Sequence, residues 1–356
     1  MAMSRLSKRT RAREQVIAID LGERTTKAVH LQRKGDTITL ARYALLDAPI
    51  YEKKLSVDLL SEHLRAVCQA VGARTRVASI ALSVNDALVR HVELPLMRVE
   101  DVRQVIKNNA KMYLQQDLPG YVFDCFLIPN RSSGQPAEEV KAGPAPKQKV
   151  LVAGARKQLV EDVQAAAKNA GLTVDQITPA LVGPVNAFEL AQPSVFAKEV
   201  VALVDIGFKN STICLVLEGE LLLTRVVAIG GDRLTSGLAE AMGVSYAEAE
   251  GIKLGMPAEV QDVLQDLITP LGRELKASID FFEHQQDRAV GQVFFSGGSV
   301  RSEFIMQLLQ GELMAECTVW NPTEFLHHAL PAQQVADLEQ VAPQLTVAIG
   351  TAIASL

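Results

Sequence analysis

The sequence predicts an α/β protein of two related domains, and three observations lead to this prediction. The chain has 356 residues, which is more than a single compact core usually holds. The stretches VIAIDLG (16–22) and VALVDIG (201–207) are alike, since each is an apolar run that ends in an aspartate and a glycine. Elsewhere predicted strands alternate with predicted helices, which is typical of sheets covered by helices.

The two similar stretches continue into matching strand and turn signals. In each copy an apolar strand ends at Asp20 or Asp205, a glycine-containing turn follows, and a second strand leads to a hairpin turn. The hairpin glycine, Gly35 or Gly219, lies 15 residues after the aspartate in the first copy and 14 in the second. Each domain is therefore expected to open with a strand–turn–strand–strand unit.

The rest of the chain alternates between helical and extended patterns. Helices are expected at 56–72 and 157–171, where apolar residues recur at helical spacing and a glycine ends the segment. The other predicted elements are helices at 99–116, 245–255 and 260–285 and strands at 77–83, 149–155 and 292–298. Residues 130–148 contain several Pro and Gly and are expected to form a flexible loop inside a domain.

Composition argues against several classes of protein. The net charge of −5 does not favour nucleic acid as a partner. The four cysteines lie far apart and the histidines form no metal motif, so isolated thiols in a reducing compartment are expected. No apolar stretch approaches the roughly 20 residues of a membrane span. Residues 1–14 carry five basic residues and one acid, and are expected to form a disordered, solubilising tail; the alternative is electrostatic contact with an anionic membrane.

The end of each repeated strand offers the groups that bind a magnesium–phosphate complex. Asp20 and Asp205 are placed to hold Mg²⁺ through water, and the glycines that follow let backbone N–H groups approach phosphate oxygens. Polar side chains in the two turns add donors, so two facing loops would clamp ATP from both sides. The predicted phosphate-binding residues are Asp20, Gly22, Thr25, Thr26, Lys27, Asp205, Gly207, Asn210 and Ser211.

A third glycine cluster follows the predicted strand at 292–298. Gly297, Gly298 and Ser299 stand between a strand and a helix, where such a turn can lie flat against a base or ribose; the alternative is a plain tight turn. The chain has neither a P-loop nor a GxGxxG motif after a strand.

With these motifs the chain resembles the actin/Hsp70/hexokinase superfamily, whose actin-like fold is a duplicated ribonuclease H-like unit around a nucleotide cleft. Within it the chain is similar to the PilM family of type IV pilus assembly proteins, relatives of the division protein FtsA. The PilM-like segments are 89–114, 149–172, 229–255 and 347–356. The resemblance implies that Glu250 and Lys253 contact the ribose and adenine, next to Gly297, Gly298 and Ser299.

The resemblance also implies the domain boundaries. Residues 15–86 begin the first domain, residues 178–200 complete it and connect it to the second, and residues 341–356 return to it. The second domain spans 201–340. Residues 87–177 form an insertion of the kind called subdomain 1C.

This chain departs from the family pattern in both phosphate loops. Glu23 and Arg24 stand where relatives have serines, and Phe208 and Lys209 stand where small residues are usual. Glu23 would repel a triphosphate unless it points away or pairs with Arg24. Phe208 is expected to crowd the cleft, or Lys209 to add a positive contact.

The segment that connects the domains departs as well. Thr178 replaces the usual acid and Pro184 interrupts an expected helix. We therefore expect the chain to bind ATP with Mg²⁺ but to hydrolyse it slowly or not at all. Asp20 and Asp205 are the candidate catalytic residues.

The resemblance implies a cytoplasmic scaffold of pilus or secretion assembly that is held at the inner membrane by partners. The alternatives are a sugar kinase of the same fold, which needs an acid to deprotonate a sugar hydroxyl, and an FtsA-like division or type II secretion component. The partner that the family implies is a cytoplasmic N-terminal peptide of a bitopic, PilN-like protein. It is expected in a groove between the first domain and the insertion, beside Val105 and Ile106; self-association stays open.

Overall fold

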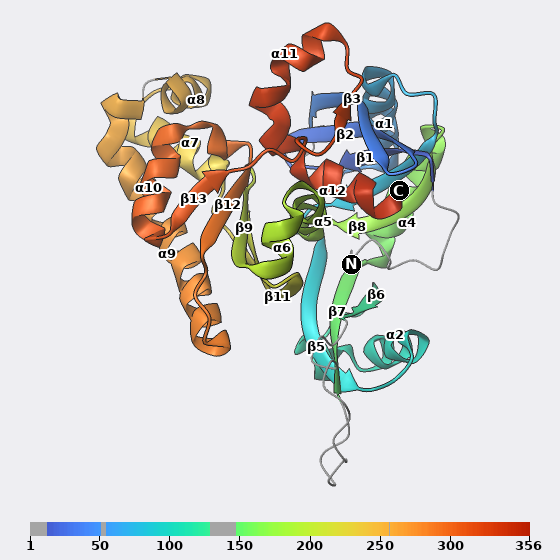
Figure 1. Cartoon of the computed structure of the whole chain (residues 1–356). Helices are drawn as coiled ribbons and strands as arrows, with labels where there is room; N and C mark the ends of the chain where they lie inside the picture. The colour runs from blue at the N-terminus through green and yellow to red at the C-terminus, as the bar shows by residue number, and fades with distance from the viewer. Residues whose placement is uncertain (1–12, 51–54, 129–146, 256) are drawn as a thin grey trace.

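The structure is a computed structural model that describes residues 13–50, 55–128, 147–255 and 257–356 (Figure 1). The predicted tail and loop therefore lie almost wholly outside the described residues. Within the described part the strands form three sheets, of six, five and three strands. No helix in these ranges is both long and apolar enough to cross a membrane.

The first sheet contains the first copy of the repeat. Its centre is β1 (Gln15–Asp20), which pairs antiparallel with β2 (Thr25–Lys34) and parallel with β4 (Val77–Leu82). The strand order is β14-β3-β2-β1-β4-β8, with β3 (Thr37–Asp47), β8 (Thr173–Pro179) and β14 (His327–His328).

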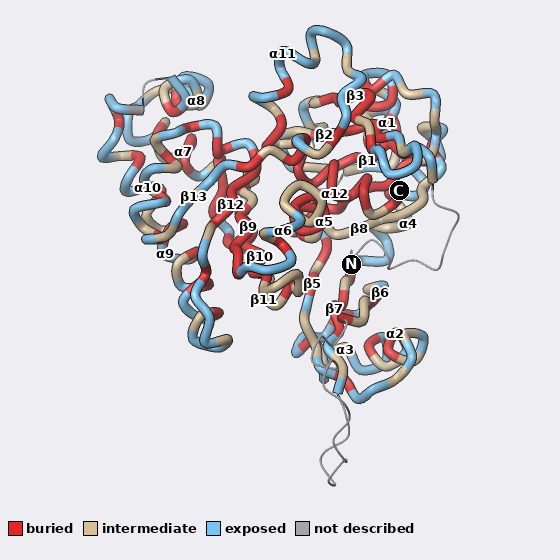
Figure 2. The backbone as a smooth tube through the Cα atoms, viewed as in Figure 1, coloured by how far each residue is buried: buried red, intermediate tan, exposed pale blue. Residues whose placement is uncertain are grey.

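The second sheet repeats this arrangement. Its order is β11-β10-β9-β12-β13, and β9 again pairs antiparallel with the next strand and parallel with a later one. The strands are β9 (Val200–Ile206), β10 (Ser211–Leu217), β11 (Glu220–Val227), β12 (Gln292–Gly297) and β13 (Glu316–Val319). Figure 2 shows that β9 and β12 are buried along their length.

Helices cover both of these sheets. Each of the two sheets, together with the helices that pack on it, is called one half of the molecule below. In the first half, α1 (Val57–Val71) and α4 (Lys157–Asn169) share one apolar cluster with β1 and β4. The N-terminus of α1 is capped by the Ser56 side chain, and the helix ends at Gly72, whose φ of 63° suits glycine. The second half carries α7 (Gly231–Met242), α8 (Tyr246–Gly255), α9 (Gln261–Gln286) and α10 (Glu303–Leu313).

A small subdomain projects from the first half (Figure 1). Its sheet has the order β5-β7-β6, and α2 packs on β6. The elements are β5 (Ala87–Pro95), α2 (Val99–Asn108), α3 (Ala110–Leu114), β6 (Tyr121–Leu127) and β7 (Lys147–Arg156). The helix predicted at 99–116 is thus two helices, because Asn109 has a non-helical backbone (φ −131°, ψ 33°).

The structure corrects three predictions about the organisation of the chain. The insertion does not extend to residue 177, because α4 packs on α1 and β8 joins the first sheet. Residues assigned to the second domain up to 340 include β14, which pairs with β3 of the first sheet. Pro184 does not interrupt a helix: it lies in the first turn of α5 (Gly183–Ala191), where its missing N–H has no intrahelical acceptor.

The chain passes from the first half to the second after α5, and it returns between β13 and β14, since β14 belongs to the first sheet. α5 leads through α6 (Pro193–Lys198) to β9, and α11 (Ala332–Val341) leads to α12 (Thr346–Ser355), which packs on α5, β1 and β2. α5 and α12 cross so closely that a Cβ added at Gly350 would overlap the carbonyl oxygen of Gly183. One apolar cluster continues across this crossing from β1 and β2 to β9, β10 and β12.

We predict that Gly350→Ala lowers the free energy of unfolding by about 1–3 kcal/mol, because overpacking at the crossing outweighs the gain in helix propensity of about 1 kcal/mol. Gly311→Ala in α10 is the matched control, since nothing lies within 4 Å of its added Cβ, and we expect it to be neutral or stabilising. Urea denaturation measures both variants. If Gly350→Ala and Gly311→Ala were equally stable, the close approach of α5 and α12 would not be a tight constraint on the fold.

Candidate nucleotide site and the adjoining groove

A cleft lies where β1 and β9 end, between the two halves of the molecule. Because β1 and β9 hold equivalent central positions, the loops that follow them face the same space. The cleft has a volume of 230 Å³. Most of the predicted residues line it, namely Asp20, Gly22, Thr25, Lys27, Asp205, Gly207, Asn210, Glu250, Lys253, Gly297, Gly298 and Ser299.

Two predicted phosphate ligands lie elsewhere. The buried Thr26 hydroxyl is 2.8 Å from the Nε2 atom of His63 on α1. The buried Ser211 hydroxyl donates to the carbonyl oxygen of Ile229 at 2.7 Å. Side chains alternate along a strand, so Lys27 and Thr212 face the cleft while their neighbours Thr26 and Ser211 face away. The period-2 pattern could have predicted this.

The cleft also contains residues that were not predicted. They are Ser83, Val84, Ala180, Thr212, Gly231, Leu254, Arg301, Gln344 and Val347, together with Glu23, Arg24 and Phe208 from the unusual loops. Several come from α12, from the turn before it and from the turn after β4, which are distant in sequence from the repeated motifs. Only Thr212 and Gly231 carried a local signal. Thr212 follows the predicted phosphate loop, and Gly231 belongs to the adjacent glycines at 230 and 231.

The centre of the cleft holds two aspartates and a lysine. Asp20 and Lys27 are direct partners across the β1–β2 hairpin, and Lys27 Nζ lies 3.1 Å from Asp20 Oδ2. Burial alone would lower the pKa of Lys27, but the charge of Asp20 and its hydrogen bond outweigh burial and raise that pKa. Burial raises the pKa of Asp205, although Ser296 on the neighbouring strand donates a 2.8 Å hydrogen bond to it.

Glycines let the surrounding loops approach one another. A Cβ at Gly297, whose φ is +102°, would overlap the backbone of Ile206 on the neighbouring strand. A Cβ at Gly231 would overlap the Ser299 hydroxyl, and one at Gly207 would lie 2.8 Å from the carbonyl oxygen of Asn210. The loops after β9 and β12 therefore present backbone rather than side chains to this part of the cleft.

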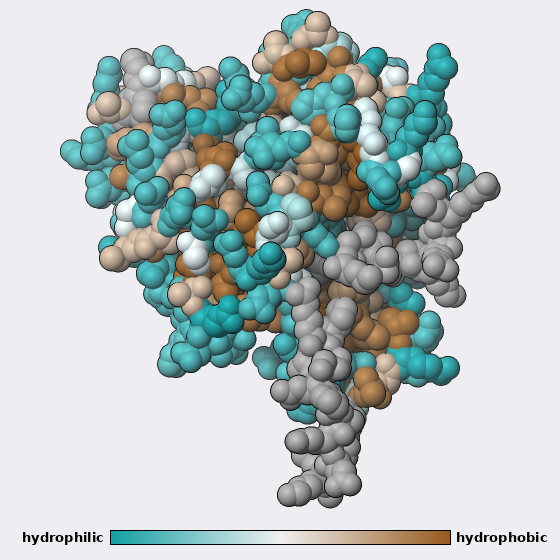
Figure 3. All heavy atoms as spheres, in the orientation of Figure 1, coloured by the Kyte–Doolittle hydropathy of each residue, from teal (hydrophilic) through white to brown (hydrophobic). Residues whose placement is uncertain are grey.

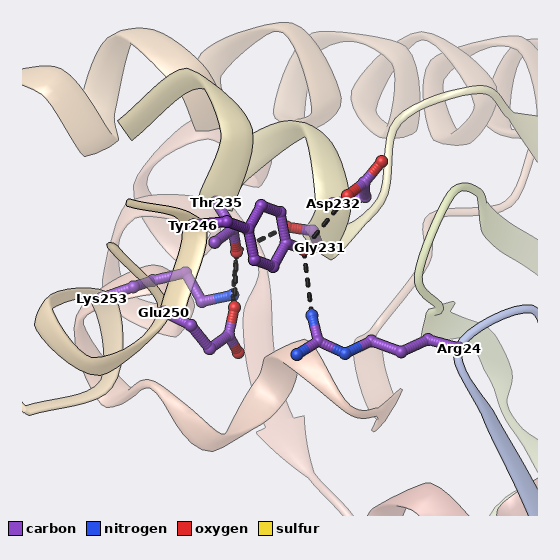
Figure 4. A network of polar contacts seen from close by, with 7 residues as sticks. All are labelled: Arg24, Gly231, Asp232, Thr235, Tyr246, Glu250 and Lys253. Atoms are coloured by element: carbon purple, nitrogen blue, oxygen red, sulfur yellow. Dashed lines mark hydrogen bonds and ion pairs between the residues drawn. The ribbon is translucent and has the colours of Figure 1, made fainter. Parts of the chain in front are cut away.

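One end of the cleft is built on α7 and α8 (Figure 4). The Lys253 ammonium is 3% exposed and donates to Glu250 Oε2 and to the Thr235 hydroxyl, both at 2.8 Å. Thr235 in turn donates to Glu250 at 2.6 Å. Burial raises the pKa of Glu250, but the hydrogen bonds from Lys253 and Thr235 prevail and lower it, so this carboxylate stays ionised at neutral pH.

Arg24 connects the two halves across the cleft (Figure 4). Its Nη1 donates to the Tyr246 hydroxyl at 2.9 Å, and that hydroxyl donates to Asp232 at 3.1 Å. The guanidinium carbon is 5.3 Å from the ring centroids of both Phe208 and Tyr246, which is cation–π distance. Glu23 does not pair with Arg24: its Oε1 accepts from the Asn85 amide at 2.5 Å.

The donor set of the cleft fits a magnesium ion only when a nucleotide supplies further oxygens. Among the described residues there is no group of three or more His, Cys, Asp or Glu side chains that could hold a metal ion. Asp20 and Asp205 are the two carboxylates next to the phosphate loops. Mg²⁺ retains several waters and commonly takes one or two carboxylates plus phosphate oxygens, which these residues and loops can provide.

A separate groove of 770 Å³ lies between the insertion and the first sheet. Residues 124–127 of β6 and 175–179 of β8 line opposite sides, and both strands are sheet edges. Asn186 and Thr178 line this groove, and the buried Asn186 Oδ1 and Thr178 Oγ1 atoms have no hydrogen-bond partner among the described residues. Thr178, the departure from the family pattern, thus lines the groove and not the cleft.

The structure corrects the prediction that Val105 and Ile106 border the partner groove. Ile106 is fully buried in the core of the insertion, and Val105 packs against the same core. Their apolar spacing on α2 reflects packing onto the three-stranded sheet. Apolar side chains do reach the surface over β6 and α2, beside the groove (Figure 3).

Comparisons with known proteins agree with this architecture. The profile of the family described as "Type IV pilus assembly protein PilM" matches residues 18–356. The cell division protein FtsA of Bacillus subtilis is 22% identical over 257 residues, which are 67% of this chain and 57% of FtsA. The match therefore spans just over half of the length of that relative.

Solved structures show the same fold. A PilM–PilN type IV pilus biogenesis complex matches with a TM-score of 0.81 and 21% identity, over 97% of this chain and 99% of that one. The ethanolamine utilization protein EutJ from Carboxydothermus hydrogenoformans has a TM-score of 0.53 and 17% identity, over 95% and 88%. MreB5 of Spiroplasma citri bound to ADP has a TM-score of 0.51 and 8% identity, over 93% and 98%. The predicted actin-like fold is confirmed.

We predict that Arg24→Ala loosens the contact between the halves by about 1–2 kcal/mol, the sum of one hydrogen bond and exposed cation–π contacts. Faster amide hydrogen exchange in the loop after β9 and in α8 is the expected result, with a smaller effect in Tyr246→Phe. Glu23→Gln is the control, because Glu23 bonds only within the first half. Unchanged exchange in Arg24→Ala would show that Arg24 does not hold the halves together.

Proposed function

Because the chain belongs to the PilM family of type IV pilus assembly proteins, we propose that it is a nucleotide-binding scaffold of pilus assembly. In this proposal a nucleotide sets the angle between the two halves, and this angle governs the binding of an inner-membrane partner. The observation that carries the proposal is the cleft in which the two repeated loops meet, with Lys27 beside Asp20 and Asp205.

Each part of ATP has a matching group in the cleft. The phosphates would meet the backbone of Gly22 and Gly207 and the side chains of Thr25, Lys27 and Asn210. Mg²⁺ supplies charge compensation for the phosphates, and Asp20 and Asp205 would hold it through water. The ribose hydroxyls can donate to the ionised Glu250, and the adenine would lie between Lys253 and the loop Gly297, Gly298 and Ser299. The fold-related MreB5 structure, which is bound to ADP, supports a nucleotide as the ligand.

A scaffold fits this cleft better than a sugar kinase or an active ATPase. Each carboxylate that lines the cleft already has a partner: Asp20 has Lys27, Asp205 has Ser296, Glu23 has Asn85 and Glu250 has Lys253. A general base must be able to reach and accept a proton from water or a sugar hydroxyl. We therefore propose slow or absent hydrolysis. The similarity to FtsA keeps an FtsA-like role as the second candidate.

The groove beside the insertion suits an extended peptide. Its sides are the edge strands β6 and β8, whose unpaired backbone groups can pair with an added strand. Its apolar lining includes Phe126, Leu151 and Val182. The PilM–PilN complex supports a cytoplasmic peptide of a PilN-like inner-membrane protein as the occupant.

The insertion also touches the second half, which offers a route for coupling. Lys149 on β7 lies 2.9 Å from Glu220 on β11, and β5 contacts β11 as well. Burial lowers the pKa of the neighbouring His91 to about 4, so this side chain is neutral in the contact. Movement of the second half on nucleotide binding would therefore shift the insertion and reshape the groove.

We predict that Mg-ATP stabilises the wild type and that Asp205→Ala abolishes this effect. At 100 times Kd the ligand adds about 2.7 kcal/mol, a rise in melting temperature of several degrees. Asp280→Ala on the exposed face of α9 is the matched control and should keep the full shift. Thermal melts with and without Mg-ATP measure all three; an equal shift in Asp205→Ala would contradict the assigned site.

We predict that Ala153→Arg weakens binding of the partner peptide by about tenfold or more, equivalent to about 1.4 kcal/mol. Ala153 lies on β7 and lines the groove, so the new side chain fills it without disturbing the core. Met112→Arg places the same side chain on an exposed position of the insertion outside the groove. Calorimetric titration with the N-terminal peptide of the PilN homologue measures both. Full affinity in Ala153→Arg would exclude this groove.

A further inference from the structure

The first described residue, Arg13, lies beside the groove. Arg13 forms a hydrogen-bonded ion pair with Asp175, a residue of β8 that lines the groove. The carbonyl oxygen of Glu14 accepts a 2.7 Å hydrogen bond from the Arg33 amide, so the backbone next to Arg13 is held on β2. Arg13, to which residues 1–12 are joined, is therefore held beside the groove.

The charges of the groove and of this segment are opposite. The groove is lined by Glu100, Asp124 and Asp175. Arg103 pairs with Asp124 at 2.7 Å and Arg13 pairs with Asp175, which leaves Glu100 as the uncompensated charge. Glu100 is exposed and has no ion-pair partner among the described residues. Residues 1–12, MAMSRLSKRTRA, contain no acid and carry the basic residues Arg5, Lys8, Arg9 and Arg11.

Two polar side chains in the wall of the groove carry buried oxygen atoms that have no hydrogen-bond partner among the described residues. Asn186 is 8% exposed, and its amide donates to the carbonyl oxygen of Gly350 while its Oδ1 atom has no donor. Thr178 Oγ1 lies in the same wall without a partner. A buried acceptor without a donor costs about 1–3 kcal/mol, but both oxygen atoms lie beneath the groove surface. The attraction of the groove for an occupant therefore comes from its charge and from the attachment at Arg13.

We propose that residues 1–12 dock in this groove and compete there with incoming peptides. Twelve extended residues span up to about 40 Å, which is ample for a groove that starts at their attachment point. The proposal goes beyond the proposed function, since it concerns the same groove but requires neither a nucleotide nor the partner. The segment acts as a tethered competitor, which an external peptide displaces only by binding more tightly.

The test uses the labelled synthetic peptide MAMSRLSKRTRA and the full chain. In the acceptor variant, Arg5, Lys8, Arg9 and Arg11 are all replaced by Gln, which removes the tethered competitor and keeps the fold. A short tether supplies a local concentration in the millimolar range, so for a peptide Kd of about 0.1 mM the wild type binds about tenfold more weakly than the variant. Fluorescence anisotropy reports saturable binding.

Matched substitutions in the acceptor variant identify the site. Glu100→Gln and Asp175→Asn are expected to weaken binding of the peptide several-fold. Glu240→Gln, which removes one charge from an exposed position of α7, leaves peptide binding unchanged. The proposal is overturned if the wild type binds the peptide as well as the acceptor variant does. Equal binding of a scrambled peptide or equal affinity in Glu100→Gln and Asp175→Asn overturns it as well. Binding of the PilN-derived peptide is measured separately, so its failure concerns only the proposed function.

Discussion

Helices α5 and α12 touch through the glycines Gly183 and Gly350, and the relation between the two halves depends on this contact. Without side chains at these positions the backbones approach directly, which allows one apolar cluster to run from the first sheet into the second. Within the described residues the chain crosses between the halves after α5 and again between β13 and β14, where Trp320 packs against Phe188 of α5. Any rotation that opens the cleft has to be accommodated at this crossing.

The electrostatics of the cleft follow from the strand register above this crossing. Asp20 faces Lys27 because the β1–β2 hairpin pairs them directly, and Asp205 faces Ser296 because β12 lies parallel to β9. Two buried carboxylates near each other would be costly without the lysine between the loops. The site thus carries its own compensating cation, and Arg24 adds a second one at the edge, where it holds both halves.

The insertion gives the first half a surface that the duplicated fold lacks. Its sheet ends at β6 and the main sheet ends at β8, so two unpaired strand edges border one groove. The same subdomain reaches the second half through Lys149 and Glu220. The insertion therefore contacts the second half and borders the groove, which is the connection that the proposed nucleotide-controlled scaffold requires.

The sequence by itself determined the duplication and most of the cleft, because an acid at a strand end and a glycine in the next turn are local signals. It also contained the information that Thr26 and Ser211 face away, through the alternation of strand side chains. The tertiary structure alone decided that Ile106 is core and that Asn186 lines a groove, since an apolar or polar helix position does not reveal its neighbour. The bridge from Arg24 to Tyr246 joins residues 222 positions apart, and only the packing of the two halves brings them together.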